Sequence, residues 1–482
     1  MIKLHNTLGN SVEEFVAHDP NHVKIYTCGL TVYSQPHIGN WLGYIYWDIL
    51  VRVLKENGYS VERTQNITDV GHLTSDDDSG EDKIEKGAEA EGVTAWDIAK
   101  KYSAVAEREA SELGLLQPDH LEPASKFVDQ QIEFAKVLET KGYTYVIPGD
   151  GLYFDTSRLQ NYGQLARLDI AGLEAGTRVS VAGKRNITDF AVWKFSPSGK
   201  KRDMEWESPW GKGFPGWHLE CSVIARETLG DQIDIHTGGI DHIPVHHSNE
   251  IAQTEAVTGK QFSTFWLHNN HIKVDGQKMS KSLGNIYTLS DIVEHGFSLD
   301  AFRMLALSKH YRTEGNFTWD ILEASQNRLQ HWRDVACLRW QTHDTLEKDD
   351  DKDTDYNVNG VVLSAPHSAL EALTNDLNTP EALVAIERAL DAIHTASPSI
   401  LQHSALVQLV DWIDNVLGLR IAETTPDIND TQKQLVIERQ RARDEKNWRR
   451  SDELRDLLAE QGIILRDTNS RTVWTRADKT SV

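Results

Sequence analysis

The sequence predicts an α/β protein built around a doubly wound parallel sheet that an inserted module splits in two, with a helical bundle and a small mixed C-terminal domain after it. A strand, a helix and a second strand follow one another within the first 70 residues. Short strand-like segments separated by Gly, Pro and Asp occupy residues 141–215. Helical patterns dominate after residue 288, so the helical part follows the sheet in the sequence.

The first element is a strand at residues 23–28, where apolar residues alternate with polar neighbours. A helix is expected at residues 39–57, because Gly58 provides a stop and an apolar stripe runs along Leu42, Ile45, Ile49 and Val53. The next strand spans residues 59–67. This βαβ unit is typical of one half of a nucleotide-binding, Rossmann-like sheet.

The inserted module follows a loop-rich acidic stretch at residues 72–90 and helical patterns at 94–140. Its strand-like pieces are Tyr143–Ile147, Leu152–Asp155 and Ala191–Phe195. Because turn residues separate these short pieces, we expect an antiparallel sheet between the two halves of the core.

The second half of the sheet resumes at Gly216. Helices are expected at 217–228 and 245–257, and strands at 232–236, 264–268 and 271–274.

The rest of the chain is expected to be mainly helical. Residues 288–342 and 358–420 carry helical periodicity on either side of an acidic linker at 344–355. Thr379 is expected to cap a helix whose first residue is Pro380.

Bulk composition limits the class of protein. The length of 482 residues suggests two to four domains, and 39% apolar with 26% charged residues is typical of a globular protein. No apolar run of about 18 residues predicts a membrane span, and the first residues lack an export signal. Three cysteines without paired spacing argue against a disulfide framework. These features favour a cytoplasmic protein.

The net charge of −23 argues against nucleic-acid binding by the chain as a whole. The charge is uneven, however, because residues 431–482 contain 12 Lys and Arg against 9 Asp and Glu. Acid is concentrated at Asp76–Asp82 and Asp349–Asp355, which we interpret as solvated loops.

Four residues have the chemistry of a metal site: Cys28, Cys221, His246 and Glu250. The last two are four residues apart, so one helical turn places them on one face. Two thiolates, an imidazole and a carboxylate are ordinary zinc ligands. From the residues alone His247 competes with His246. The third cysteine, Cys337, lies among apolar residues and is expected to pack in a core.

Two motifs flank these residues. His37-Ile38-Gly39-Asn40 opens the first helix, and Lys278-Met279-Ser280-Lys281-Ser282 follows a strand. The pair, in this order, resembles the two signatures of class I aminoacyl-tRNA synthetases. The family is narrowed to cysteinyl-tRNA synthetases by further blocks: Thr27–Gly29, Asn66–Asp69, Asp189–Lys194, Ser208–Gly211, Gly216–His218 and His246–Gln253. The resemblance runs from about residue 20 to about residue 475.

The first motif suits a phosphate site. A helix N-terminus offers free N–H groups and positive potential to phosphates. His37 can donate to a phosphate oxygen, and Gly39 leaves room for the nucleotide. Asn40 replaces the more familiar final His of the tetrapeptide, so we expect a changed contact there.

The second motif supplies cations. Lys278 and Lys281 would neutralise charge that develops on the triphosphate. By resemblance, Lys281 makes the more direct ATP contact. Taken alone, the two would pass for solvated loop lysines.

Pocket residues are expected at the ends of the strands. Gly238 and Gly239 would permit close approach of adenosine, and Asp241 would hold a ribose hydroxyl or the substrate ammonium. His236 is either a pocket residue or a satisfied core histidine. Further substrate contacts are expected at Gly29, Thr68 and Trp217.

The resemblance implies the cofactors and partners. One Zn²⁺ per chain, held by Cys28, Cys221, His246 and Glu250, would bind the thiolate of L-cysteine and so exclude serine. ATP with Mg²⁺ and tRNA(Cys) would be the other substrates. No membrane partner is expected, and we expect a monomer.

The C-terminal region is expected to read tRNA. A basic helix carries Arg439, Arg441, Arg443, Lys446, Arg449 and Arg450 with Trp448 among them, and an aromatic can stack on an unpaired base. A helix ending at Gln461, a stop at Gly462 and a hairpin from 463–466 to 472–475 complete it. A solvated amphipathic helix is the simpler interpretation of the basic residues.

The resemblance divides the chain into six parts. They are 1–115 (first half of the catalytic core), 116–215 (inserted connective module), 216–290 (second half with the metal and the ATP loop), 291–345 (helical stem-contact region), 356–425 (helical bundle binding tRNA) and 430–482 (anticodon-binding domain). The chain departs from the family pattern at Leu30, Ser248 and the long stretch Gly71–Lys83.

Two other functions are compatible with parts of the pattern. An ATP-dependent ligase that joins cysteine to an aminosugar, as in mycothiol synthesis, would share the core and the zinc, but such enzymes lack a domain like 430–482. A non-catalytic RNA-binding paralogue would not need His37, Lys278, Lys281 and all four metal ligands.

Overall fold

The computed structural model describes residues 1–71, 73, 82–168, 183–197, 199, 202–342, 356–397, 400–467 and 472–477. These residues form two compact units. The first comprises Met1–His271 with Tyr311–Glu314, and the second comprises Ile272–His310 with Gly315–Val482. The acidic linker at 344–355 and most of the stretch Gly71–Lys83 lie outside the described residues.

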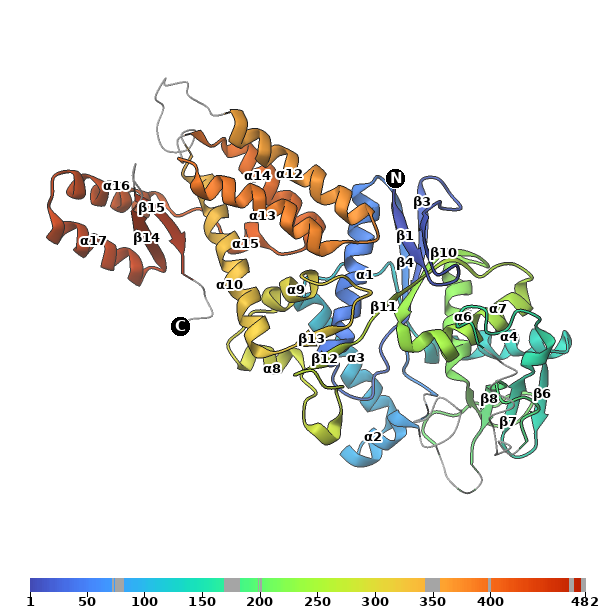
Figure 1. Ribbon diagram of the computed structural model, residues 1–482. Helices are drawn as coiled ribbons and strands as arrows, with labels where there is room; N and C mark the ends of the chain where they lie inside the picture. The colour runs from blue at the N-terminus through green and yellow to red at the C-terminus, as the bar shows by residue number, and fades with distance from the viewer. Residues whose placement is uncertain are drawn as a thin grey trace. The chain divides into compact units, whose positions relative to one another are not determined.

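The first unit contains a five-stranded parallel sheet, which confirms the predicted doubly wound core (Figure 1). Its strands, in spatial order, are β11 (Ser263–Asn269), β10 (Ile233–Gly239), β3 (His22–Thr27), β4 (Ser60–Ile67) and β5 (His120–Pro123). The chain runs from β3 outward through β4 to β5, then returns to the other side of β3 with β10 and β11. The order therefore reverses between β3 and β10, and a crevice opens at the carboxyl ends of strands at such a point.

Helix α1 (Ile38–Glu56) connects β3 to β4 within one residue of its predicted bounds. The predicted stop is present, because Asn57 caps the helix and Gly58 follows with a φ of 90°. The prediction of a single apolar stripe underestimates how much of the helix is buried. The helix is buried on most of its surface, and Tyr311 packs against Tyr46 and Trp47.

The other helices of this unit are α2 (Lys83–Glu91), α3 (Ala95–Glu112), α4 (Val128–Thr140), α6 (Trp217–Leu229) and α7 (Ser248–Thr258), of which α6 packs against β4. Helices α6 and α7 pack side by side (Figure 1). The prediction of helix throughout 94–140 is wrong at β5. That strand is a half-buried edge of four residues ending in Pro123, so it lacks the alternation that identifies a strand. An N-terminal hairpin of β1 (Lys3–Asn6) and β2 (Ser11–Glu14) was not predicted.

The inserted module is a four-stranded antiparallel sheet, as predicted. Its strands are β6 (Thr144–Ile147), β7 (Gly151–Phe154), β8 (Phe190–Phe195) and β9 (Gly213–Pro215) in that order. Its core contains the stacked rings of Phe154 and Phe190, whose centroids lie 5.0 Å apart. Strand β9, with only three residues, was missed by the sequence pattern.

The second unit begins with β12 (Ile272–Val274), which pairs in parallel with β13 (Gly315–Phe317). Its helices are α8 (Leu289–Glu294), α9 (Leu299–Leu307), α10 (Trp319–Ala336), α12 (Tyr356–Thr374), α13 (Thr379–Thr395), α14 (His403–Trp412) and α15 (Ile421–Thr424). The prediction of helix throughout 288–342 is wrong at β13. The prediction that Thr379 caps α13 is also wrong, because the Asn378 side chain accepts the N–H of Glu381 and Pro380 lies one position further in.

The C-terminal region has the predicted hairpin, β14 (Ile463–Asp467) and β15 (Thr472–Arg476), after α16 (Asp430–Asp444) and α17 (Trp448–Glu460). The prediction of a single basic helix is wrong, because a turn at Lys446, with a φ of 60°, separates α16 from α17. Cys337 packs against Ile428, Leu458 and Trp474, which confirms its predicted core role.

Among the described residues, no helix combines the length and the apolar character needed to cross a membrane. The six-part functional division of the chain stays a prediction.

Candidate active site and metal centre

The four predicted metal ligands converge at the point where the sheet order reverses. Cys28 directly follows β3, and Cys221 lies on α6. His246 lies in a single π-helical turn, η4 (Ile243–His247), and Glu250 lies in the first turn of α7. Their ligand atoms all lie within 4.8 Å of one another, and all four residues are buried. The predicted grouping is therefore present, and π turns are frequent at functional sites.

The carboxylate of Glu250 lies at the middle of the cluster. Its Oε1 is 3.1 Å from Nε2 of His246, and its Oε2 is 2.9 Å from Nε2 of His236. Burial alone would raise the pKa of Glu250, but the two imidazoles outweigh it and hold this pKa well below its ordinary value. The carboxylate is thus an anionic donor with no exposed surface.

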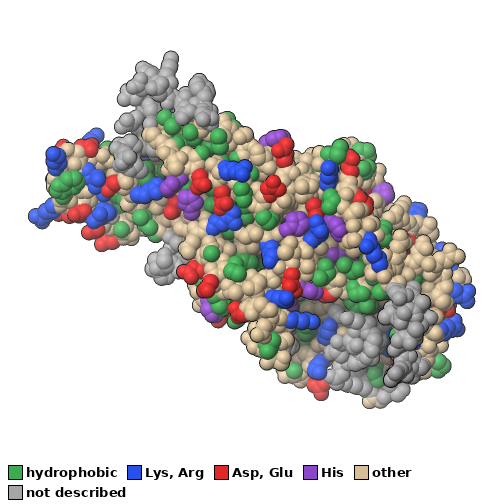
Figure 2. All heavy atoms as spheres, in the orientation of Figure 1, with side chains coloured by type: hydrophobic (Ala, Val, Ile, Leu, Met, Phe, Trp, Pro, Cys, Tyr) green, Lys and Arg blue, Asp and Glu red, His purple; other side chains and the backbone are tan. Residues whose placement is uncertain are grey.

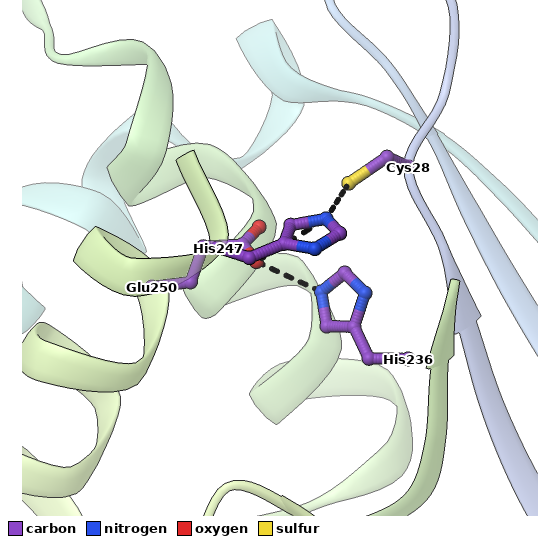
Figure 3. Close-up of side chains that lie close together, drawn as sticks. All are labelled: Cys28, His236, His247 and Glu250. Carbon is purple, nitrogen blue, oxygen red and sulfur yellow. Dashed lines mark hydrogen bonds and ion pairs between the residues drawn. The ribbon is translucent and has the colours of Figure 1, made fainter. Parts of the chain in front are cut away.

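A second donor group shares two residues with the first. Figure 3 shows Cys28, His236, His247 and Glu250 pointing toward one another from the end of β3, from β10, from η4 and from α7. The Cys28 Sγ lies 3.2 Å from Nε2 of His247. Sequence reasoning gave His236 only an open role and favoured His246 over its neighbour. Geometry alone permits either imidazole pair, because both groups satisfy the same 4.8 Å limit.

Two further histidines, which the sequence did not single out, hold the donors in orientation. Nδ1 of His247 lies 2.7 Å from Nε2 of His268, whose Nδ1 meets the hydroxyl of Thr7 at 2.7 Å. Nδ1 of His218 lies 3.0 Å from Nδ1 of His246. Such outer hydrogen bonds fix the ring orientation of a metal-binding histidine. His218 stands three residues before Cys221, which was the one available signal.

The protonation chemistry of the cluster fits a divalent cation. Burial raises the pKa of Cys28 to about 11, and it raises the pKa of Cys221 as well. Burial also lowers the pKa of His247 and of His268, which favours neutral imidazole. His246 differs, because Glu250 and Cys221 outweigh burial and raise its pKa to about 10, so a cation would have to displace its proton as well. Thiols this buried ionise when a cation replaces their protons. Two sulfurs, imidazole nitrogen and a carboxylate are donors that suit zinc.

Two glycines make the packing around the cluster possible. A Cβ on Gly29 would lie 1.5 Å from the carbonyl oxygen of Asn66, whose side chain also accepts the Gly29 N–H at 2.7 Å. A Cβ on Gly238 would lie 2.6 Å from Cε1 of His247. Gly238 therefore makes room for an imidazole of the cluster. The predicted approach of adenosine to Gly238 and Gly239 stays a prediction.

The N-terminus of α1 is built as predicted, with His37 at the cap. Nδ1 of His37 accepts the Asn40 N–H at 3.3 Å, and Oδ1 of Asn40 accepts the His37 N–H at 3.0 Å. Burial lowers the pKa of His37, so the neutral ring with its proton on Nε2 is favoured. Nε2–H is then the ring's donor. The Asn40 side-chain oxygen is used in the cap, so the contact that Asn40 could offer a ligand is a hydrogen bond donated by its Nδ2 group. Gly39 is the second residue of the helix.

The remaining pocket candidates lie near the strand ends. Thr68 follows β4 and accepts a hydrogen bond from the Asn66 amide at 3.0 Å. Trp217, the first residue of α6, stacks on His246 with centroids 4.3 Å apart and planes 13° apart. Asp241 is exposed in a short turn after β10. Their contacts with substrate stay predictions.

The two motif lysines belong to the second unit, on the segment between β12 and α8. Lys278 is exposed, and Lys281 begins the short turn η5 (Lys281–Leu283). Asn285 holds this segment, because its Oδ1 accepts the Ser280 N–H at 2.8 Å and its Nδ2 donates to the Lys278 carbonyl at 3.2 Å.

The basic residues near the C-terminus differ in their surroundings, and their contact with tRNA stays a prediction. Arg439 is buried and bonds to Asp467 and to Thr472, so it holds α16 to the hairpin. Arg449 and Arg450 pair with Glu453 and Glu438. Over α16 and α17, Figure 2 shows Lys and Arg side chains interspersed with Asp and Glu. Trp448 remains 56% exposed.

Comparison with known proteins covers both ends of the chain. Residues 14–327 match the family model described as the class I (C) tRNA synthetase catalytic domain, and residues 425–474 match the cysteinyl-tRNA ligase anticodon binding domain. The chain is 44% identical over 474 residues to cysteine–tRNA ligase 1 of Burkholderia lata, covering 97% of this chain and 95% of that protein. It is 38% identical over 500 residues to the cysteine–tRNA ligase of Treponema denticola, covering 98% and 99%.

Solved structures agree on the fold. Methionyl-tRNA synthetase of Mycobacterium tuberculosis bound to methionyl-adenylate superposes with a TM-score of 0.61 at 13% identity, covering 84% of this chain and 93% of that one. The Agrobacterium radiobacter LeuRS ternary complex gives 0.60 at 12% identity, covering 85% of each chain. With a catalytic and an anticodon-binding model matched, and relatives aligned over nearly its whole length, the chain belongs to the class I cysteinyl-tRNA synthetase family.

Proposed function

We propose that this chain is a cysteine–tRNA ligase. It activates L-cysteine with Mg-ATP as cysteinyl-adenylate and transfers the cysteinyl group to the 3′-terminal adenosine of tRNA(Cys). The observation that carries the proposal is the buried group of two cysteines, a histidine and a glutamate at the crevice of the sheet. A site of this composition next to a nucleotide crevice suits a substrate recognised through sulfur.

The first reaction needs positioning more than covalent help. A carboxylate oxygen of cysteine attacks the α-phosphorus of ATP, the bond from this phosphorus to the bridging oxygen breaks, and pyrophosphate leaves with the electron pair. The N–H groups at the start of α1 and Nε2–H of His37 face the phosphates as donors. The capping pair of His37 and Asn40 keeps these donors in place before ATP arrives.

The charge that builds on pyrophosphate is neutralised by the lysines of the second unit. In this proposal Lys281 contacts ATP directly and Lys278 assists it. In the second reaction a ribose hydroxyl of the terminal adenosine attacks the carbonyl carbon of the adenylate, and AMP leaves.

Cysteine is selected at the metal centre. Cys28, Cys221, His246 and Glu250 would hold one Zn²⁺, which when bound supplies a cation that prefers sulfur to a hydroxyl oxygen. A pocket relying on shape would separate cysteine from serine by only ~10–200-fold. Gly29, Thr68, Trp217 and His236 would surround the amino acid, and Asp241 would take its ammonium or a ribose hydroxyl.

The C-terminal region would read tRNA(Cys), which is supported by its match to an anticodon-binding model. This match also favours tRNA over an aminosugar as the acceptor. We expect a monomer, and we place the reaction in the cytoplasm, where Cys28 and Cys221 would stay reduced and able to bind the metal.

Cysteine-dependent exchange between ATP and labelled pyrophosphate tests the first reaction with zinc-loaded protein. Charging of tRNA(Cys) with labelled cysteine, beside transfer to glucosaminyl-inositol, tests the acceptor. We expect exchange with cysteine, none with serine, and charging of tRNA alone. Transfer only to the aminosugar, equal use of serine, or absence of exchange would overturn the proposal.

A further inference from the structure

A buried carboxylate on a neighbouring helix accepts hydrogen bonds from residues on both sides of the turn that begins α1. Glu109 lies near the end of α3 and is 2% exposed. Its Oε1 accepts a hydrogen bond from Nε2 of Gln35 at 2.8 Å, and its Oε2 accepts one from Nε1 of Trp41 at 2.8 Å. Both oxygens are therefore engaged, and each binds a different part of the chain.

The two donors bracket the His37–Asn40 turn. Gln35 lies two residues before the cap, and Trp41 is the fourth residue of α1. The hydrogen bonds between His37 and Asn40 shape the turn internally. The bonds from Glu109 tie the turn to α3, so that it has a defined direction relative to the crossover between β4 and β5.

A carboxylate is a costly choice for this position. Burial raises the pKa of Glu109, while the hydrogen bonds from Gln35 and Trp41 act in the opposite direction. An apolar side chain could fill the space without that cost, but it could not orient two donors on separate segments. Hydrogen bonds to a charged acceptor are shorter and stronger than hydrogen bonds between neutral groups, so a carboxylate can hold the turn at the start of α1 in one orientation.

We propose that Glu109 is a positioning residue for adenylation, which through Gln35 and Trp41 holds His37 and the start of α1 in the orientation that ATP requires. It touches neither substrate nor metal. The inference rests on the proposed function, since it assigns the phosphate site to the N-terminus of α1. An error of about 1 Å in the placement of such a site costs roughly 100-fold in rate.

The charge of Glu109 could also have the opposite effect and weaken ATP binding, and this alternative gives the test two distinct outcomes. Glu109 brings a negative charge to the neighbourhood of a polyphosphate site. If charge repulsion were its main effect, removing the charge would tighten ATP binding. If positioning is its main effect, removing either oxygen as an acceptor weakens ATP use although the charge has gone.

The test uses the full-length, zinc-loaded protein and measures pyrophosphate exchange against ATP and against cysteine, with direct binding of a non-hydrolysable ATP analogue. We expect Glu109→Ala to lower kcat/KM for ATP by about 10- to 100-fold. The KM for cysteine and the zinc content should stay unchanged. Glu109→Gln keeps one acceptor oxygen and should fall between Glu109→Ala and the parent protein.

Glu112→Gln is the matched control, because Glu112 lies on the same helix but is exposed and pairs only loosely with Arg108 at 3.6 Å. Trp41→Phe keeps a smaller aromatic ring at this buried position and loses the N–H donor. If Glu109 acts through Trp41, the double variant Glu109→Ala with Trp41→Phe should lose no more than Glu109→Ala alone.

Unchanged or tighter use of ATP by Glu109→Ala would overturn the inference. Equal loss for cysteine and ATP, recovered on cooling, would mean that Glu109 only stabilises the fold and would overturn it too. A parent protein without cysteine-dependent exchange would refute the proposed function itself, and the inference with it. Exchange in the parent and the control, with a loss confined to ATP in Glu109→Ala, supports both.

Discussion

At the scale of single residues, the two oxygens of Glu250 face different imidazoles. One faces His246 and the other faces His236, at 3.1 and 2.9 Å. The same carboxylate thus belongs to both donor groups, and so does Cys28. Cys221 and His246 occur only in the proposed zinc site, and His236 and His247 only in the alternative one, so a change at Cys221 distinguishes the two groups.

Cys221→Ser should therefore abolish stoichiometric zinc. A hydroxyl at this position stays protonated and is a poor ligand, so zinc affinity should fall by more than the roughly 100-fold typical of losing an outer hydrogen bond. Cysteine binding should fall with it, while binding of an ATP analogue survives. Metal analysis after dialysis and calorimetry with each ligand measure the three quantities.

Cys337→Ala is the control for that variant, because Cys337 is buried in a different core. It should keep its zinc. Full zinc and full cysteine binding in Cys221→Ser would instead indicate the group of Cys28, His236, His247 and Glu250.

At the scale of elements, the segment between β12 and α8 is shaped by Asn285. Its side chain bonds to backbone atoms of Ser280 and Lys278, so it closes a small ring around the motif. This brings order to a segment whose lysines are expected to meet ATP. The backbone of the segment is therefore held in place, although Lys278 itself is exposed, as the simpler interpretation of its sequence expected.

Asn285→Ala should raise the KM for ATP by about tenfold, because two hydrogen bonds of about 0.5–1.5 kcal/mol each are lost. Lys281→Ala should instead slow adenylation with no change in zinc content. Pyrophosphate exchange measures both. Gln277→Ala, at an exposed neighbouring position, should behave as the parent protein; the same rise in that variant would argue against a specific role of Asn285.

The C-terminal hairpin depends on a carboxylate held by arginines. Hydrogen bonds from Arg439 are the main cause that lowers the pKa of Asp467, to about 2, and Arg443 adds to the effect. An acid whose pKa is lower in the folded state stabilises that state above its unfolded pKa of about 3.9. That contribution is lost as the pH falls from about 4 through about 2.

We therefore expect amide protection of β14 and β15 to decline over this acidic range. Hydrogen exchange of the hairpin, followed by mass spectrometry at a series of pH values, measures it. Asp467→Asn should weaken protection at neutral pH and flatten its acid dependence. A variant with an unaltered acid dependence would rule out Asp467 as the cause.

At the scale of the whole molecule, the proposed function has cysteine recognised by the first unit and tRNA by the second. The metal residues lie in the first unit, and α16 and α17 lie in the second. Changes in one function should therefore leave the other intact.

Trp448→Ala tests this separation, because Trp448 is the exposed aromatic of the C-terminal region. A base stacked on it would contribute about 1–3 kcal/mol, so the KM for tRNA(Cys) should rise roughly 5- to 150-fold. Pyrophosphate exchange should be unchanged. Leu457→Ala, also exposed on α17, is the control, and an equal effect of both variants would point to a loss of helix stability.

Much of the fold was predictable because long elements carry a clear period. Helix α1 and the hairpin at the C-terminus lie within a residue or two of their predicted bounds. Three of the missed strands have a common cause. Strands β5, β9 and β13 have three or four residues, too few for a pattern, and they are defined by pairing with strands distant in the chain.

The site was predictable to the level of residue type but not of partner. His246 and His247 lie four and three residues from Glu250, so both share its helical face and spacing cannot choose between them. His268 and Glu109 gave no signal, since a histidine in a strand and an acid on an amphipathic helix are ordinary. Arg439 looked like its basic neighbours, and only folding revealed that it is buried.

The position of the metal centre also bears on how the chain assembles. Cys28 directly follows β3, while Cys221 belongs to α6, which comes after the entire inserted module in the chain. A cation held by both would act as a fastener between early and late parts of the polypeptide, closing a very long loop. The full set of four donors would come together only in the folded first unit, so tight zinc binding would accompany its assembly, and release on heating would accompany its melting.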